Sequence, residues 1–436
     1  MESHGKNRVF FITFGCKVNL TETEAMKKIF CNEGFRAASD ESEADIFVIN
    51  SCTVTDTADL KLKKTLSRLR RSYPAAIIAL TGCYSEIHPE KTDFADIIIG
   101  TSGRNKLPGM IKNQIAKSLP PENLFAENNP PAGIFEDFSL TNFTGNTRAF
   151  LKIQDGCNMN CAYCIIPKTR GSFRSKPLES VISDAKTLCE NGFKEIVLTG
   201  INLAFYGVEF GLRLINAVEA IADNATGVRI RLGSLEPEII SDSDIARLKE
   251  INVCPHFHLS LQSACDRTLE RMNRHIKIAQ YMKLVAKLRE NFPLAAITTD
   301  IIVGFPGETE EDFAISCANI EKIGFANIHI FPYSKREGTA AADMPCQIPE
   351  NVKKNRAKIL AEIAEKSRRE FEQSFIGKTL NVLFEKEKTP GFHRGFSENY
   401  IHVEVSGEGS WRNELFPVHI TGVTGEGLLG EIVRDN

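Results

Sequence analysis

The sequence has no long apolar segment, no basic apolar leader and no large excess of charge of one sign. Its longest apolar runs, such as AAIIALTG from Ala75 and DIIIG from Asp96, are far shorter than the roughly 20 residues of a membrane-spanning helix. Because a secretory leader is missing, we expect a cytoplasmic protein without a membrane partner. The formal net charge is −3 over 436 residues, so binding to a polyanion has to depend on local basic patches.

Cysteine, in contrast, is abundant, with twelve residues in the chain. In a reducing compartment such thiols are more often metal ligands or buried apolar groups than disulfides. Three of them form the pattern Cys157-x3-Cys161-x2-Cys164. A structural zinc site needs a fourth ligand, and none of the nine histidines lies between His88 and His256. Three thiolates on an iron–sulfur cube instead leave one iron open, as a reactive cluster requires.

A second set of cysteines, Cys16, Cys52 and Cys83, ends three apolar runs that are followed by helix-like or turn-like segments. Such continuous Ile/Val/Phe runs predict the buried strands of a doubly wound parallel α/β domain, which we place at residues 1–130. Parallel strands end at the same edge of a sheet, so the three thiols are expected to converge there. Gly15 and Gly82 would allow the close approach. The alternative interpretation is three separate buried thiols.

The middle of the chain, residues 145–374, contains further strand-then-helix units. A closed eightfold barrel takes about 250 residues, so this shorter segment predicts an open (β/α)6 partial TIM barrel. The six predicted strands are AFLKIQDG, EIVLTG, VRIRLGSLEP, HFHLSLQS, AITTDIIVGFPG and NIHIFPYS. Residues 119–138, rich in Pro, Asn and Glu, are predicted to be a linker. Residues 375–436 alternate in short strands and predict a small antiparallel β-barrel.

These features together carry a resemblance to a known family. The Cys157-x3-Cys161-x2-Cys164 loop resembles that of the radical S-adenosylmethionine superfamily. With the N-terminal cysteine domain and a C-terminal barrel similar to the TRAM module, the chain resembles the methylthiotransferases. The resemblance is carried by FGCKVNLTETEA, NSCTVTDTAD, GCYSE and KIQDGCNMNCAYCIIPKTRG. The CKVN and CTVT forms resemble the branch that acts on N6-threonylcarbamoyladenosine in tRNA, whereas the isopentenyladenosine branch usually has Gln-Met after the first cysteine and the ribosomal-protein branch Pro-Lys.

The resemblance implies two [4Fe–4S] clusters and S-adenosylmethionine as cofactors. The cluster on Cys157, Cys161 and Cys164 would cleave S-adenosylmethionine to a 5′-deoxyadenosyl radical, which removes the hydrogen at C2 of the adenine at tRNA position 37, next to the anticodon. The cluster on the other three cysteines would hold the sulfur, methylated by a second S-adenosylmethionine. The product would be 2-methylthio-N6-threonylcarbamoyladenosine.

The same resemblance implies binding partners and leaves alternative substrates and functions open. The partners are the tRNA anticodon stem-loop, an electron donor such as flavodoxin or ferredoxin, and a sulfur donor. The same chemistry on isopentenyladenosine of tRNA or on a ribosomal-protein aspartate remains an alternative. A more remote one is a non-catalytic, metal-stabilised RNA-binding protein.

Further site residues are predicted from the strand ends and from one basic patch. The predicted cofactor contacts are Tyr163, Gly200, Asn202, Ser234, Glu236, Gln262, Val303 and Phe305. The glycine is equally expected in a tight turn after its strand. The predicted RNA contacts are Lys168, Arg170, Arg174 and Lys176, which directly follow the cysteine loop. Because the C-terminal barrel has six Lys/Arg and nine Asp/Glu, any RNA contact there is expected to position the RNA rather than attract it.

Overall fold

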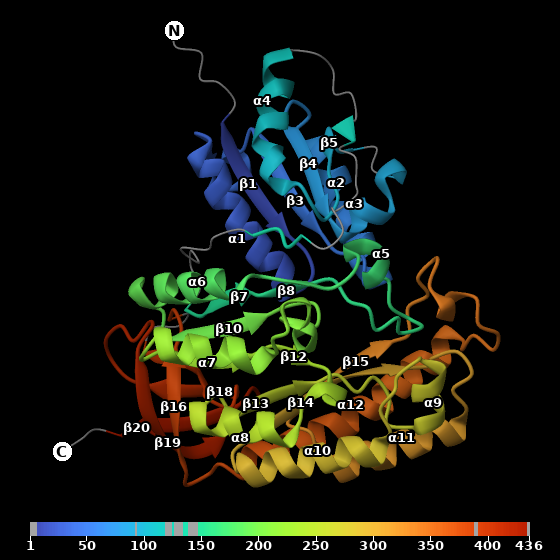
Figure 1. Cartoon of the computed structure of the whole chain (residues 1–436), viewed down its shortest axis with the longest axis vertical. Coiled ribbons are helices and arrows are strands. Elements are labelled where there is room, and N and C mark those ends of the chain that lie inside the picture. Colours follow the sequence, from blue (N-terminus) through green and yellow to red (C-terminus); the bar gives the residue numbers. More distant parts are fainter. Residues whose placement is uncertain are drawn as a thin grey trace.

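The structure is a computed structural model that describes residues 7–91, 94–117, 124–125, 134–137, 147–387 and 391–433. An N-terminal sheet with its helices lies above a larger open barrel, and a small β-barrel lies beside that barrel (Figure 1). Within the described ranges, every helix is too short or too polar to cross a membrane. Apart from residues 124–125 and 134–137, the predicted linker at 119–138 lies outside the described residues.

The N-terminal part is one six-stranded parallel sheet with helices on both faces. Its elements are β1 (Arg8–Thr13), α1 (Lys17–Asn32), β2 (Arg36–Ala37), β3 (Ile46–Ser51), α2 (Asp56–Ser72), β4 (Ile77–Gly82), α3 (Cys83–Ile87), β5 (Ile97–Ile98), α4 (Leu107–Lys117) and β6 (Leu124–Phe125). The strand order is β2-β1-β3-β4-β5-β6. The predicted doubly wound domain is therefore confirmed, with the two-residue strands β2 and β6 in addition.

Strand β3 shows why these residues form a buried parallel sheet. Ile46 and Val48 belong to the core that α1 and α4 cover, whereas Phe47 and Ile49 belong to the core that α2 covers. A strand buried on both faces needs apolar side chains at every position, which produces the continuous run. The chain order reverses between β1 and β3, and ligands of such sheets bind beyond the carboxyl ends of the strands at this point.

The central part is an open barrel of parallel strands surrounded by helices. Its elements are β7 (Ala149–Lys152), β8 (Gln154–Asp155), α5 (Ile166–Arg170), β9 (Arg174–Ser175), α6 (Leu178–Glu190), β10 (Glu195–Thr199), α7 (Leu214–Asn224), β11 (Arg229–Leu232), β12 (Ser234–Leu235), α8 (Asp242–Ile251), β13 (His256–Leu259), α9 (Asp266–Arg271), α10 (Ile278–Asn291), β14 (Ala296–Val303), α11 (Glu310–Ile323), β15 (Asn327–Pro332) and α12 (Glu350–Gln373).

The barrel strands form two sheets, β11-β10-β7 and β12-β13-β14-β15. All six predicted strands are present, so the open (β/α)6 barrel is confirmed. The third of them is divided at Gly233, whose backbone N–H donates to the carbonyl oxygen of Leu198. The short antiparallel pair of β8 and β9 was not predicted.

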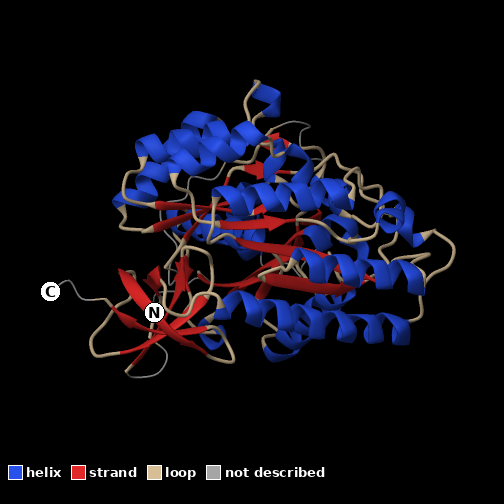
Figure 2. Cartoon of the chain, turned by 90° about the horizontal axis from the view of Figure 1, so that it is seen from below, coloured by secondary structure: helices blue, strands red, loops and turns tan. Residues whose placement is uncertain are grey.

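The C-terminal part is a closed five-stranded barrel (Figure 2). Its strands are β16 (Thr379–Phe384), β17 (Phe392–Ser397), β18 (His402–Ser406), β19 (Leu415–Val423) and β20 (Leu428–Ile432). The predicted small barrel is confirmed, and its fold fits a TRAM-like domain. One detail differs from the predicted antiparallel arrangement: β18 pairs with β20 in parallel.

Candidate active site

Cys16, Cys52 and Cys83 come together at the carboxyl edge of the N-terminal sheet. Cys16 precedes α1, Cys52 follows β3, and Cys83 is the first residue of α3. Burial raises the pKa of Cys16, and it raises that of Cys52 to about 12, with the neighbouring thiols Cys83 and Cys16 adding to the effect. The predicted convergence of the three thiols is therefore present in the structure.

Two glycines allow this convergence, as predicted. Gly15 has a φ of +100°, and a Cβ on it would lie 2.6 Å from the Cβ of Cys52. Gly82 has a φ of +104°, and its Cβ would lie 2.4 Å from the carbonyl oxygen of Ser51. No other residue fits these distances without moving the backbone.

The second cysteine set lies in the loop between β8 and α5. The backbone N–H of Cys164 donates to the carbonyl oxygen of Cys161 (3.0 Å), and that of Cys157 donates to Gly171 (3.1 Å). All three thiols are free and partly exposed. Burial raises the pKa of Cys157, and it raises that of Cys164 to about 12 with help from the other two thiols. Three partly exposed soft donors in one short loop fit an iron–sulfur cube with one iron not bound by the protein.

Two of the predicted cofactor contacts lie directly against this loop. The side-chain amide of Asn202 is 3.7 Å from the sulfur of Cys157, and its backbone N–H donates to the Gln154 side chain at 2.7 Å. A Cβ on Gly200 would lie 2.9 Å from the Cβ of Gln154. The end of β10 is thus packed onto the strand that leads into the cysteine loop, and glycine is needed there for packing.

Glu236 at the end of β12 is held by an arginine that was not predicted as a site residue. Arg274 forms an ion pair with Glu236 at 2.6 Å, and its guanidinium also lies 3.8 Å from the sulfur of Cys161. Arg274 is nearly fully buried, so its positive charge acts on the loop without screening by water. Its position shortly after α9 gave no signal in the sequence beyond a general basic character.

The remaining predicted cofactor contacts differ in exposure. Ser234 is exposed, and Gln262 is partly buried with a φ of +73°, a conformation that a non-glycine residue rarely adopts. Val303 is buried, and Phe305 is fully buried in a cluster that Tyr163 packs against. The side chain of Phe305 therefore supports the cysteine loop, and at this position only backbone atoms are left to meet a cofactor.

Three of the four predicted RNA contacts are enclosed by other residues of the chain. Arg170, Arg174 and Lys176 are buried, and all three are paired with carboxylates. Arg170 and Arg174 both contact Asp155, at 3.0 and 2.9 Å. A side chain enclosed in this way does not reach an RNA phosphate. Lys168 is exposed and stays a prediction.

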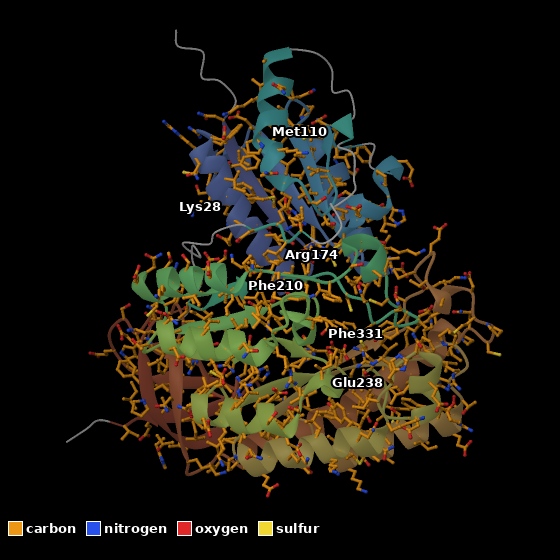
Figure 3. All side chains as sticks on the ribbon, viewed as in Figure 1. Lys28, Met110, Arg174, Phe210, Glu238 and Phe331 are labelled. Atoms are coloured by element: carbon orange, nitrogen blue, oxygen red, sulfur yellow. The ribbon has the colours of Figure 1, made fainter. Side chains whose placement is uncertain are left out.

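Arg170 instead joins the N-terminal sheet domain to the barrel, together with Lys152. Glu22 on α1 is fully buried and contacts Arg170 at 2.8 Å, Lys152 at 2.7 Å and Arg104 at 3.1 Å. Burial alone would raise the pKa of Glu22, but the three cations outweigh it and hold that pKa well below its usual range. In Figure 3 the label of Arg174 marks this junction between the two parts.

The junction also connects the two cysteine sets. Arg170, on the helix that follows the loop of Cys157, donates to the side-chain oxygen of Asn19 at 2.7 Å. The same oxygen lies 3.7 Å from the sulfur of Cys16. One buried arginine thus links the loop of Cys157 to the surroundings of Cys16, which fixes the two sets relative to each other.

Comparisons with known proteins agree with this architecture. The radical SAM superfamily model matches residues 151–317, and the model of the uncharacterized protein family UPF0004 matches residues 8–100. Among solved structures, the radical S-adenosylmethionine methyltransferase TsrM from Kitasatospora setae has a TM-score of 0.55 at 13% identity and covers 77% of each chain. The fold and the three-cysteine loop define the class of radical S-adenosylmethionine enzymes.

Similar sequences identify the family within this class of enzymes. The threonylcarbamoyladenosine tRNA methylthiotransferase MtaB of Bacillus subtilis is 37% identical over 94% of this chain and 93% of its own length. The protein of the same name from Aquifex aeolicus is 35% identical, covering 92% and 97%. The tRNA-2-methylthio-N(6)-dimethylallyladenosine synthase of Methylacidiphilum infernorum is 34% identical, covering 97% and 94%. The chain belongs to the family of radical SAM tRNA methylthiotransferases, enzymes that use S-adenosylmethionine and [4Fe–4S] clusters.

Proposed function

We propose that this enzyme methylthiolates C2 of N6-threonylcarbamoyladenosine at position 37 of tRNA, next to the anticodon. The observation that carries this proposal is the segment from Cys16 to Asn19, whose CKVN form resembles the branch with that substrate. Relatives named for threonylcarbamoyladenosine, at 37% and 35% identity, support it. The relative named for dimethylallyladenosine, at 34% identity, makes isopentenyladenosine the second candidate substrate.

We further propose which residues hold the cofactors. Cys157, Cys161 and Cys164 hold the cluster that binds S-adenosylmethionine, and Cys16, Cys52 and Cys83 hold the second cluster. When bound, these groups supply the one-electron chemistry and the methylthio group for an inert C–H bond. The proposed contacts to S-adenosylmethionine are Tyr163, Gly200, Asn202, Ser234, Glu236 and Gln262, together with the backbone at Val303 and Phe305.

The residues around the cysteines contribute by positioning the two cysteine sets and by placing donors and charge next to their sulfurs. Asn202 donates toward the sulfur of Cys157, and Arg274 toward that of Cys161. Hydrogen bonds and positive charge next to cluster sulfurs stabilise the reduced, more negative state. The buried pair of Arg170 and Glu22 joins the helix after the Cys157 loop to α1, and this connection would hold the two cysteine sets in a fixed relation around the substrate.

The partners follow from the reaction. We propose a flavodoxin or a ferredoxin as electron donor, a separate sulfur donor, and the cytoplasm as the place of action, since tRNA is found there. Lys168 is the exposed cation that we propose to contact the phosphate backbone of the anticodon stem-loop.

The test compares two substrates on the same enzyme. Anaerobically reconstituted protein, reductant and S-adenosylmethionine are incubated with anticodon stem-loops carrying threonylcarbamoyladenosine or isopentenyladenosine at position 37. Nucleoside mass spectrometry is expected to detect the methylthio product from the first stem-loop. Modification of the isopentenyladenosine stem-loop alone would show that the second candidate is correct.

A further inference from the structure

Four polar side chains from one helix and three adjacent strands gather on the inner face of the barrel. His258 on β13 lies 3.3 Å from the carboxylate of Asp300 on β14, and the ligand atoms of these two and of His329 on β15 all lie within 4.8 Å of one another. Lys17, at the start of α1, reaches the same region: its ammonium group lies 5.6 Å from the centre of the Tyr400 ring, whose centre is 4.9 Å from that of His256 on β13. The neighbouring strand residues Ile297, Ile301 and Ile328 belong to the core beneath the helices, so these polar residues face the opposite way, into the barrel.

This cluster is accessible to a ligand. His329 and Lys17 are exposed, and Asp300 is partly exposed. Two residues beyond His329, and therefore on the same face of β15, Phe331 is 41% exposed (Figure 3). The cluster thus offers polar groups and one aromatic surface side by side.

The cluster also lies next to the reaction. Lys17 directly follows Cys16 in the chain, and the strands β13 to β15 belong to the same barrel as the loop of Cys157.

The charges of the cluster favour an anion over a metal cation. Among the described residues, Lys17 forms no ion pair, and its ammonium group lies 5.6 Å from the centre of the Tyr400 ring. The carboxylate of Asp300 already has a partner in His258 at 3.3 Å, and His258 also forms a hydrogen bond with Thr298 at 3.0 Å. Burial lowers the pKa of His329, and the positive charge of Lys17 contributes to that effect. An unpaired ammonium beside two imidazoles disfavours a divalent cation and attracts a carboxylate.

We propose that Lys17, His329, His258 and Asp300 form the binding site for the threonylcarbamoyl group of the substrate. Lys17 and His329 bind its carboxylate, and Asp300 accepts a hydrogen bond from its hydroxyl or ureido N–H. This inference rests on the proposed substrate. An isopentenyl group has no polar atom and would leave the Lys17 ammonium without a partner, so the same site selects against it.

The experiment measures equilibrium binding to the reconstituted, unreduced enzyme, so that no turnover occurs. Three stem-loops are compared, with threonylcarbamoyladenosine, its methyl ester or isopentenyladenosine at position 37. The enzyme is expected to bind the acid about 10- to 100-fold more tightly than the ester, as for a hydrogen bond to a charged group. Lys17→Met should remove this difference by weakening binding of the acid, while the ester keeps its affinity and the isopentenyladenosine stem-loop binds at least as tightly as before. Lys27→Met, on the same helix but paired with Glu24, is the matched control and should change nothing.

Several results would overturn the inference. Equal affinity of the unaltered enzyme for acid and ester would do so, as would an equal loss for all three stem-loops in Lys17→Met. Because Lys17 adjoins Cys16, iron content is measured in parallel, and His329→Gln provides a second variant remote from the cysteines. Loss of one metal equivalent in Asp300→Asn, with the acid-to-ester ratio intact, would identify a metal site instead. Modification of isopentenyladenosine alone would refute the proposed substrate, and is seen separately in the turnover assay.

Discussion

The substitution Glu22→Gln tests whether the buried junction holds the two cysteine sets together. Glu22 is enclosed by Arg170, Lys152 and Arg104, with its carboxylate 2.7–3.1 Å from their nitrogens. Glutamine keeps the volume, so no cavity forms, but three buried cations lose a shared negative charge. Removing one partner of a buried ion pair costs about 3–5 kcal/mol. We therefore expect the free energy of unfolding of the junction to fall by about that amount.

The assay is amide hydrogen exchange of α1 and α5 near neutral pH, because exchange reports local opening and chains with several domains do not in general unfold in one two-state step. The pKa of Glu22 is lowered on folding, so its stabilising charge is fully present above the unfolded pKa of about 4.3 and is lost as pH falls below it. The matched control is Glu33→Gln, which removes an ion pair to Lys112 of similar length, 2.7 Å, but about half exposed. An exposed pair contributes about 0–1 kcal/mol. Equal effects of the two substitutions would refute the reasoning.

Three further predictions concern other sites. Burial alone would raise the pKa of Glu195, but Arg231 and Arg229 lower it to about 2. The charge of Glu195 thus adds about 3 kcal/mol to the free energy of unfolding above about pH 4.5, and this contribution is lost as the pH falls toward about 2. Calorimetry should find that this acid dependence is weaker in Glu195→Gln. Gly82→Ala, whose Cβ would lie 2.4 Å from a carbonyl oxygen, should reduce iron from about eight to about four per chain while S-adenosylmethionine cleavage persists; unchanged iron would contradict the packing argument. Arg274→Gln should shift the reduction potential of the first cluster to more negative values in a redox titration, and an unchanged potential would exclude its influence.

The sequence allowed the fold and the meeting of the cysteines to be predicted because both depend on local patterns. Apolar runs locate parallel strands, and parallel strands place the residues at their carboxyl ends along one edge of the sheet. The role of Arg170 could not be predicted, because its partner Glu22 lies 148 positions away, and a basic residue after a cysteine loop has the same appearance whether it is buried or exposed. His258, Asp300 and His329 were missed for the same reason, since only the pairing of three separate strands brings them together.

The central claim is that two three-cysteine sets cooperate on threonylcarbamoyladenosine, with different tasks. Its most direct test is one measurement on the variant with alanine at Cys16, Cys52 and Cys83, incubated with reductant, S-adenosylmethionine and the threonylcarbamoyladenosine stem-loop. Mass spectrometry quantifies 5′-deoxyadenosine and the methylthio nucleoside in the same sample. We predict that 5′-deoxyadenosine is still formed and that the methylthio nucleoside is absent. Formation of the methylthio nucleoside by this variant would contradict the account.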